Sequence, residues 1–282
     1  MPLRLPIAFA VFTALSVPTH HPLIVERARF PSGATPTAVP RTPSFVRPII
    51  RRHDRPDSLY LQLGAQYASI AHLYLPVLSG AADGEGTLIA PRWVLTAAHV
   101  ANEIAAGHRV TVGGRPYPVD SIVLHPAWTN GPHDIALLRL ARAVQGITPA
   151  RLYRDSAELD RMVVLVGYGD IGDGLTGPQS NDGQVRGATN LVDEATDRWL
   201  ELLFDPPGSP RTTSLEGVSG PGDSGGPAFL HGAEEEVLVG ISSGQSTRAT
   251  GGQPGRYGVT EYYTRVSRYV EWVESLTGPL TP

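Results

Sequence analysis

A serine lies within the glycine-rich segment Gly222-Asp223-Ser224-Gly225-Gly226-Pro227. A hydroxyl that attacks an acyl group must project from a tight turn whose backbone N–H groups also face the developing oxyanion. Glycines around Ser224 permit such a turn, in which Gly222 and Ser224 supply the two N–H donors. A plain Gly-Pro turn would explain Gly225-Gly226-Pro227 but not the residues before it. The segment therefore predicts a nucleophile at Ser224 and an oxyanion hole formed by Gly222 and Ser224.

Two other segments carry the base and the acid that such a nucleophile requires. His99 ends an apolar run and two alanines, which would place its ring at the end of a strand, facing a cleft. Asp134 heads a strongly apolar strand, where a buried carboxylate needs a donor such as an imidazole N–H. Taken alone, His99 is more often structural and Asp134 more often a strand cap. With Ser224 they form a candidate nucleophile, base and acid set.

Short apolar runs bounded by turns predict an all-β fold after Ser58. The 31 Gly and 26 Pro among 282 residues favour many tight turns over a helical bundle. Two stretches have helical spacing, Ala97–Glu103 and Ser267–Leu276. The predicted strands are Ala68–Leu78, Gly86–Ile89, Val110–Val112, Asp120–Leu124, Ile135–Leu140, Met162–Gly167, Trp199–Phe204, Pro227–Leu230 and Val237–Ser242.

The N-terminal residues have the composition of a leader followed by a linker. Arg4 precedes an apolar run with small residues at its end, so residues 1–16 are typical of a secretory signal peptide. The run is too short to span a bilayer, which disfavours a membrane anchor. Residues 17–57 are rich in Pro and Arg and predict a linker or a pro-segment, followed by one domain over 58–282. We expect a secreted or periplasmic protein.

Charge and cysteine content exclude several classes of partner and site. The formal net charge of −4 gives no basic footprint for nucleic acid or anionic lipid, so we expect neither as a partner. The chain contains no cysteine. Disulfides, a thiolate nucleophile and cysteine-based metal sites are therefore excluded.

Three motifs, in their order along the chain, resemble a known family. LTAAHV (95–100), HDIALLRL (133–140) and PGDSGGP (221–227) are similar to the His, Asp and Ser blocks of the chymotrypsin/trypsin family. The other two well-known triad folds have different orders, and a lipase or esterase also needs an α/β chain. The resemblance implies two packed six-stranded antiparallel β-barrels with a C-terminal helix, divided at about residues 141–157.

The resemblance also implies an activity and a role for each residue. Ser224 would attack the scissile carbonyl, His99 would carry the proton to the leaving amine, and Asp134 would fix the imidazole tautomer. Such a serine endopeptidase needs no metal and no cofactor. Its partner is a protein or peptide substrate, and we expect a monomer. The alternative is a protease-like binding protein that keeps the fold around an incompetent site.

Substrate preference depends on residues that are located by counting from the motifs. Counting back six from Ser224 places Val218 at the base of the primary specificity pocket, which favours small or apolar residues before the cut. A gapless count places Glu261 on the pocket wall, where it would accept a basic side chain or obstruct the pocket; the alternative is a solvated glutamate at a strand edge. A count with a gap places Gly258 there. The strand Ser243-Gly244-Gln245 is expected to pair with the substrate backbone.

Activation depends on Asp223, the residue before the nucleophile. In this family a new N-terminal Ile or Val ammonium pairs with that aspartate and forms the oxyanion hole. One hypothesis pairs Asp223 with a terminus created at Ile49 or Ile50. The other pairs it with a cation among the residues that follow, which are Arg51, Arg52 and His53.

Overall fold

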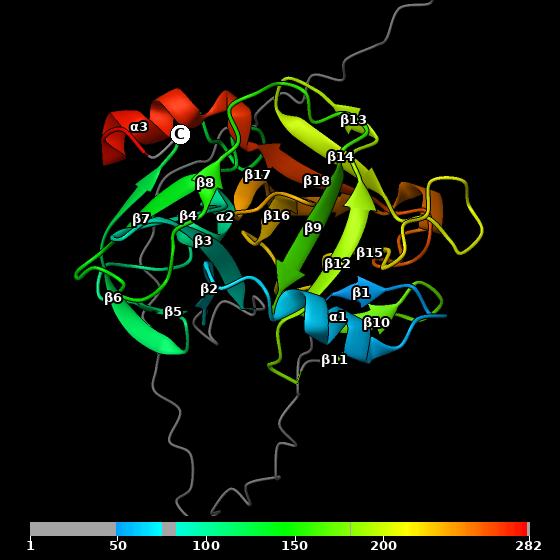
Figure 1. Ribbon diagram of the computed structural model, residues 1–282. Helices are drawn as coiled ribbons and strands as arrows, with labels where there is room; N and C mark the ends of the chain where they lie inside the picture. The colour runs from blue at the N-terminus through cyan, green and yellow to red at the C-terminus, as the bar shows by residue number, and fades with distance from the viewer. Residues whose placement is uncertain (1–48, 75–82, 181, 281–282) are drawn as a thin grey trace, which may run out of the picture. The chain divides into compact units, whose positions relative to one another are not determined.

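The computed structural model describes residues 49–74, 83–180 and 182–280, which form a mostly β structure (Figure 1). Six strands close into an antiparallel barrel in the order β2-β3-β4-β7-β6-β5. The first of the two expected six-stranded barrels is therefore confirmed. Its strands are β2 (Ile70–Leu73), β3 (Gly84–Ala90), β4 (Trp93–Thr96), β5 (Arg109–Val112), β6 (Arg115–Leu124) and β7 (Ala136–Leu140).

The strands of this barrel carry apolar residues on both faces, so side chains fill its interior and also pack against neighbouring elements on its outer surface. In β7 four of the five residues are buried, and Arg139 alone is exposed. Successive side chains of a strand point to opposite faces, so one set fills the barrel and the other lies under neighbouring elements. The largest apolar cluster joins barrel residues such as Leu137 to Val164 and Phe229 of the second sheet.

The second sheet has the order β12-β9-β16-β17-β18-β14-β13, and β8 pairs with β17 beside this path. Among the described residues its two outer long strands, β12 and β14, are joined by a side chain and not by a ladder: Asn190 Nδ2 donates to Leu203 O at 3.2 Å. The second barrel is thus a partly open one. Its strands are β8 (Arg151–Leu152), β9 (Met162–Gly167), β12 (Arg186–Leu191), β13 (Glu194–Ala195), β14 (Trp199–Leu203), β16 (Pro227–Leu230), β17 (Val237–Ser246) and β18 (Thr260–Arg265).

A small third sheet incorporates the start of the described chain. β1 (Ile50–Arg51) pairs parallel to β10 (Ile171–Asp173) and antiparallel to β15 (Gly217–Val218), and β10 also pairs with β11 (Gly177–Ser180). Ile49 and Ile50 are 1% and 0% exposed. The folded unit therefore begins before Ser58, where the sequence pattern predicted the domain to start. The predicted signal peptide and most of the predicted linker lie outside the described residues.

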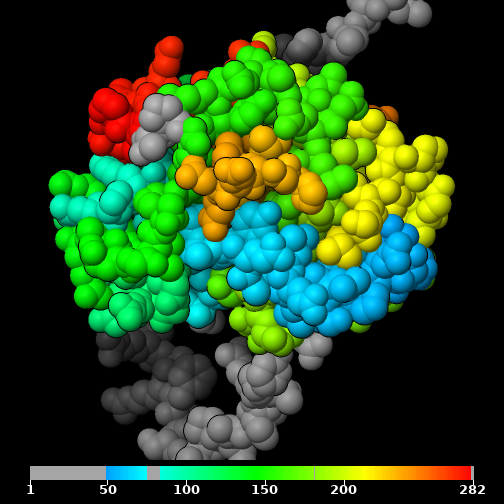
Figure 2. All heavy atoms as spheres, in the orientation of Figure 1, coloured from blue at the N-terminus to red at the C-terminus, as the bar shows by residue number. Residues whose placement is uncertain are grey.

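A short helix follows β1 and was not predicted. Helix α1 (Asp57–Gly64) buries Tyr60, whose hydroxyl donates to Glu216 O at 3.1 Å. Gly64 lies directly against the backbone of Arg186 in β12, where a Cβ would overlap it. Eight residues are too few to form a stable helix on their own, so α1 depends on these tertiary contacts. In Figure 2 its segment, in blue, lies on the surface beside residues near 210, in yellow.

The two predicted helical stretches are confirmed. Helix α2 (Ala98–Ala101) follows β4, and α3 (Val270–Thr277) follows the 3-10 turn Val266–Arg268 near the C-terminus. A second 3-10 turn spans Arg248–Thr250. No helix in the described ranges combines the length and apolar character that crossing a bilayer requires.

Candidate active site

His99 and Asp134 meet at the end of the first barrel. His99 lies in α2 directly after β4, and Asp134 lies just before β7, which pairs with β4. Asp134 Oδ1 accepts the backbone N–H of His99 at 2.9 Å, and Oδ2 lies 2.7 Å from His99 Nδ1. An ionised carboxylate only accepts hydrogen bonds, so Nδ1 carries the proton and Nε2 is left as an acceptor. The pair therefore presents a basic nitrogen.

The Asp134 carboxylate is held by a third donor that the sequence pattern did not reveal. Ser243 Oγ donates to Asp134 Oδ2 at 2.5 Å, and Thr264 Oγ1 donates to Asp134 O at 2.8 Å. Burial raises the pKa of Asp134, but hydrogen bonds from His99 and Ser243 outweigh it and hold the pKa below its usual value. Asp134 is 3% exposed and ionised, as its pairing with His99 requires.

The turn around Ser224 leaves two backbone N–H groups without an acceptor among the described residues. Gly222 has φ +102°, a conformation that favours glycine. Over residues 220–226, and within the described part of the chain, only the N–H groups of Gly222 and Ser224 lack a protein acceptor. The other N–H groups are bonded: Gly220 to Asp223 Oδ2 (2.7 Å), Asp223 to Gly220 O (3.1 Å), Gly225 to Ser242 O (2.9 Å) and Gly226 to Asp223 O (2.9 Å).

This turn is attached to the barrel that carries His99. Glu85 N–H of β3 donates to Ser224 O at 2.8 Å. A Cβ built on Gly225 would overlap Thr96 Oγ1 and lie 3.2 Å from Ala97 N, two residues before His99. Ser224 Oγ makes no hydrogen bond to His99 among the contacts of the described residues. Such bonds are often long before substrate binds, and the two segments already lie side by side.

Asp223 points away from the turn into the protein and is 1% exposed. Its carboxylate accepts N–H groups from Gly169 (2.5 Å), Gly220 (2.7 Å) and Ile49 (3.2 Å). Burial raises the pKa of Asp223 to about 6, although the N–H donors oppose the rise. The nitrogen of Ile49 thus lies where the first activation hypothesis requires a new terminus.

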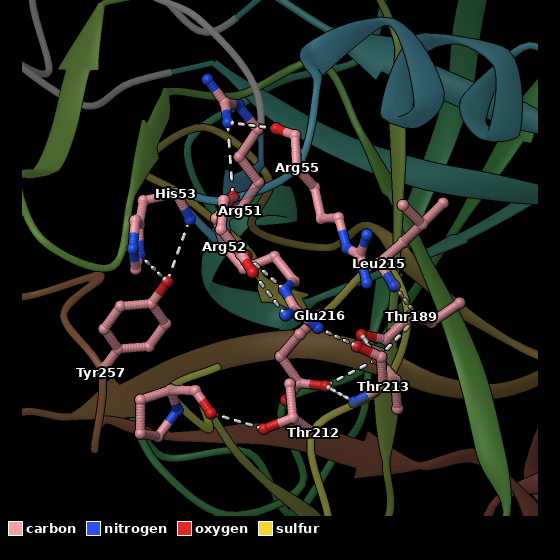
Figure 3. Close-up of polar contacts among 12 residues, drawn as sticks. Arg51, Arg52, His53, Arg55, Thr189, Thr212, Thr213, Leu215, Glu216 and Tyr257 are labelled. Atoms are coloured by element: carbon pink, nitrogen blue, oxygen red, sulfur yellow. Dashed lines mark hydrogen bonds and ion pairs between the residues drawn. The ribbon is translucent and has the colours of Figure 1, made fainter. Parts of the chain in front are cut away.

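The second activation hypothesis is wrong, because the three cations after Ile50 have other partners (Figure 3). Arg51 Nη1 donates to Arg55 O at 2.9 Å. Arg52 is paired with Asp54 at 2.6 Å and also donates to Thr213 O at 2.7 Å. His53 N–H donates to the hydroxyl of Tyr257 at 3.0 Å. None of these side chains is bonded to Asp223.

The residues predicted for substrate selection lie close to one another. Val218 is fully buried in an apolar cluster with Ile50, Phe204 and Val259. Directly after it, the N–H and hydroxyl of Ser219 both donate to the Glu261 carboxyl, the N–H at 2.9 Å. These bonds place Glu261 beside Ser219, and Glu261 also pairs with Gln245 in the register of β17 and β18, whereas Gly258 donates its N–H to Phe204 O at 2.9 Å.

Glu261 and Gln245 are both hydrogen-bonded to Ser219. Glu261 is 0% exposed, and burial raises its pKa to about 8, so the carboxyl is mainly neutral at pH 7. Gln245 Nε2 donates to Ser219 O at 2.8 Å, and Gln245 Oε1 accepts Gly255 N–H at 3.2 Å. The Gln245 side chain therefore joins the segment of Ser219 to that of Gly255.

A cleft of about 540 Å³ opens beside the His99–Asp134 pair. The predicted strand Ser243-Gly244-Gln245 forms one side of it. Three aromatic residues that the sequence pattern did not single out also line it: Trp128, Trp199 and Tyr262. They come from three separate segments, so no local motif brings them together. Nowhere in residues 49–74, 83–180 and 182–280 are three His, Asp or Glu side chains grouped to hold a metal ion.

Comparison with known proteins agrees with this architecture. Residues 76–273 match the Trypsin family profile. Serine protease SP24D of Anopheles gambiae is 29% identical over 208 residues, which are 67% of this chain and 70% of that protein. A trypsin of Simulium vittatum is 30% identical over 195 residues, 62% of this chain and 75% of that protein.

Solved structures show the same fold at lower identity. Neuropsin, a serine protease expressed in the limbic system of mouse brain, superposes with a TM-score of 0.58 at 22% identity. That match covers 80% of this chain and 98% of neuropsin. HL collagenase superposes with a TM-score of 0.60 at 19% identity and covers 77% and 96% of the two chains. The chain belongs to the trypsin family and is a serine-type endopeptidase.

Proposed function

We propose that this chain is a secreted endopeptidase that hydrolyses peptide bonds through an acyl-enzyme on Ser224. Ser224 Oγ attacks the scissile carbonyl while its proton passes to His99 Nε2. The same nitrogen then gives the proton to the leaving amine. Water, activated by His99, attacks the ester, and the acid product leaves with Ser224 restored.

The observation that carries this proposal is the pattern of hydrogen bonds in the turn 220–226. In the described part of the chain, the N–H groups of Gly222 and Ser224 have no protein acceptor, and these two residues flank Asp223 in the sequence. Loss of one oxyanion donor typically raises the barrier by about 3 kcal/mol in acyl-transfer enzymes. The Nδ1-protonated imidazole held by Asp134 adds the base that the hydroxyl needs.

We further propose that cleavage of the Pro48–Ile49 bond activates the enzyme. In the intact chain Ile49 contributes only a peptide N–H to Asp223, and its φ of +52° is strained for a β-branched residue. Cleavage would free this backbone and replace the N–H by an ammonium next to a buried carboxylate. Ion pairing would then hold the turn more firmly.

Small or apolar residues are the proposed preference before the cut. Val218 is apolar, Glu261 is buried in a neutral form, and the Gln245 amide is bonded to Ser219 O, directly after Val218. Gln245→Gly should therefore broaden the preference toward larger apolar side chains, measured as a cleavage profile on a peptide library. An unchanged profile, or a strict preference for Arg in the parent enzyme, would contradict this assignment.

The proposed function is tested by treating the processed protein with an organophosphonate probe and mapping the label. We expect one label per chain on Ser224, and none in Ser224→Ala. An inert Ser224 in folded, processed protein would favour the alternative of a protease-like binding protein. Sequencing the N-terminus of protein recovered outside the cell tests secretion and the position of the cut together.

A further inference from the structure

A second buried carboxyl lies against Asp223. Glu85 on β3 is 0% exposed, and its carboxyl contacts that of Asp223 in the interior of the protein. Both carboxyls lie over Gly167, where a Cβ would overlap Asp223 Oδ1 and lie 3.2 Å from Glu85 Oε2, and Glu85 Oε2 also lies over Gly226, where a Cβ would overlap it. Two ionised carboxylates in one water-free site would repel each other strongly, so at least one proton must be bound between them.

The hydrogen-bond donors around the two groups indicate which one carries the proton. Asp223 accepts three backbone N–H groups, from Gly169, Gly220 and Ile49. Glu85 Oε1 accepts the N–H of Tyr168. No N–H or O–H group of the described residues donates to Glu85 Oε2. Three N–H donors stabilise the ionised form of Asp223, whereas Oε2 of Glu85 has the position of a protonated oxygen that donates to Asp223.

The charges around the pair favour the same assignment. Burial, and next the negative charge of Asp223, raise the pKa of Glu85 well above its usual value. Burial, and next Asp223, also raise the pKa of nearby Asp170 to about 6. Within the described chain no Arg or His is bonded to either carboxyl. The other titratable groups that face the pair are Asp83, Tyr168, Glu261 and Tyr263.

The backbone of Glu85 is attached to the nucleophile turn as well. Its N–H donates to Ser224 O at 2.8 Å, and its carbonyl accepts Thr96 Oγ1 at 2.5 Å. Glu85 therefore contacts the turn twice, at the carbonyl of the nucleophile and at the side chain of Asp223. Both contacts come from the barrel that also carries His99.

We infer that Glu85 is a positioning residue for the oxyanion hole: its protonated carboxyl donates to Asp223 and holds the turn that leaves the Gly222 and Ser224 N–H groups free. This inference rests on the proposed role of Ser224. It also explains the charge balance after processing, when one Ile49 ammonium meets one carboxylate. An ionised Glu85 would leave a second negative charge unmatched and push Asp223 from its place.

The inference has a definite pH dependence. Because the pKa of Glu85 is raised in the folded protein, its stabilising contribution is complete below the usual pKa of about 4.3 and is lost as pH rises through the raised value. The catalytic turn should therefore loosen on the alkaline side. Glutamine, which carries N–H donors at every pH, should keep the turn in place where glutamate loses its proton.

The test compares processed protein with its Glu85→Gln and Glu85→Leu variants. Gln can donate to Asp223 and accept from Tyr168, whereas Leu fills the space and does neither. The readouts are kcat, KM and the rate of phosphonate labelling across roughly pH 5 to pH 10. The matched control is Glu216→Gln, because Glu216 is also buried with a pKa raised to about 7 but is bonded to Thr213 and Asp205.

We expect Glu85→Gln to keep kcat within about 3-fold of the parent at neutral pH and to move the alkaline limb to higher pH. Glu85→Leu should lose about 30-fold or more in kcat with KM changed less than about 3-fold, because an oxyanion donor acts in the transition state. Glu216→Gln should behave like the parent.

Two outcomes would overturn the inference while leaving the proposed function intact: an active parent with equal losses in Glu85→Gln and Glu85→Leu, or an alkaline limb unchanged in Glu85→Gln. If Glu85→Leu does not fold, the position of the alkaline limb in the pH profile of Glu85→Gln decides whether the inference holds. A parent that is neither active nor labelled would overturn the proposed function itself.

Discussion

Replacing Asp134 by Asn should reverse the tautomer of His99. The backbone N–H of His99 lies 2.9 Å from Oδ1 and cannot become an acceptor, so the amide oxygen of Asn must take that position. The amide NH₂ then faces His99 Nδ1, at the place of Oδ2, 2.7 Å away. Nδ1 must accept this bond, which moves the ring proton to Nε2. The nitrogen that should receive the Ser224 proton is then already protonated.

The expected loss is large because the site keeps its shape and loses its base. In enzymes with this triad the same substitution lowers kcat by about 10⁴-fold, equivalent to about 5.5 kcal/mol of barrier. We expect a similar loss here at neutral pH. KM should change by less than about 3-fold, since Asp134 is 3% exposed and its carboxylate is bonded to His99 and Ser243.

Initial rates on a fluorogenic peptide, normalised by active-site titration of the parent, measure this loss. The control is Asp205→Asn, because Asp205 is 7% exposed and accepts a serine hydroxyl at 2.7 Å but has no contact with His99. It should retain the parent kcat. If folded Asp134→Asn kept more than about a tenth of kcat, or if Asp205→Asn lost as much, the tautomer reasoning would be refuted.

Three further predictions concern the turn and the buried ion pairs. Gly222→Ala should lower kcat about 100-fold, because its Cβ would lie 2.9 Å from Gly169 Cα at a residue with positive φ. The control Gly232→Ala, at a φ of +77° with open space around it, should keep the parent kcat, and equal losses in the two variants would contradict this prediction. Arg186→Met should lower the free energy of unfolding, measured by urea titration, by about 3 kcal/mol, because Arg186 is 2% exposed and paired with Asp57 and Asp182. The control is Arg151→Met, which removes an exposed pair with Glu235 and should leave the free energy of unfolding nearly unchanged. The Arg186 hydrogen bond lowers the pKa of Asp182 to about 2, so the contribution of this pair to stability is present above the ordinary pKa of aspartate and is lost as pH falls through about 2. Asp182→Asn should therefore make the free energy of unfolding depend less on pH in that window. An unchanged dependence on pH would contradict the pairing.

The fold class was predictable from local patterns, and the candidate site was predicted from three short motifs taken together and in their order along the chain. A nucleophile turn needs glycines beside the serine, so Gly222 and Ser224 stand out without knowledge of the rest of the chain. An acid at the head of an apolar strand needs a donor, which singled out Asp134. Short apolar runs and helical spacing predicted the all-β class and both helices, whereas the closed first barrel was expected from the family resemblance.

Features that depend on distant partners were not predictable. Helix α1 packs against Arg186, more than a hundred residues away in the sequence, and its own eight residues carry no pattern that predicted a helix. Counting located Gln245 on the substrate strand, but only the structure places its amide on Ser219 O. Glu85 satisfies the rule that singled out Asp134, an acid in a buried strand, yet its partner is another acid. No pattern of sequence indicates such a pair.

The most direct test of the central claim is to trap the acyl-enzyme. Processed protein is mixed with an activated ester and the released alcohol is followed through the first turnover. Samples quenched in acid are analysed by mass spectrometry, both as intact protein and as peptides. We predict a burst of one product per chain and the acyl mass on the peptide that contains Ser224. Steady turnover without a burst, or an acyl group on any other residue, would contradict the assignment of Ser224 as the nucleophile.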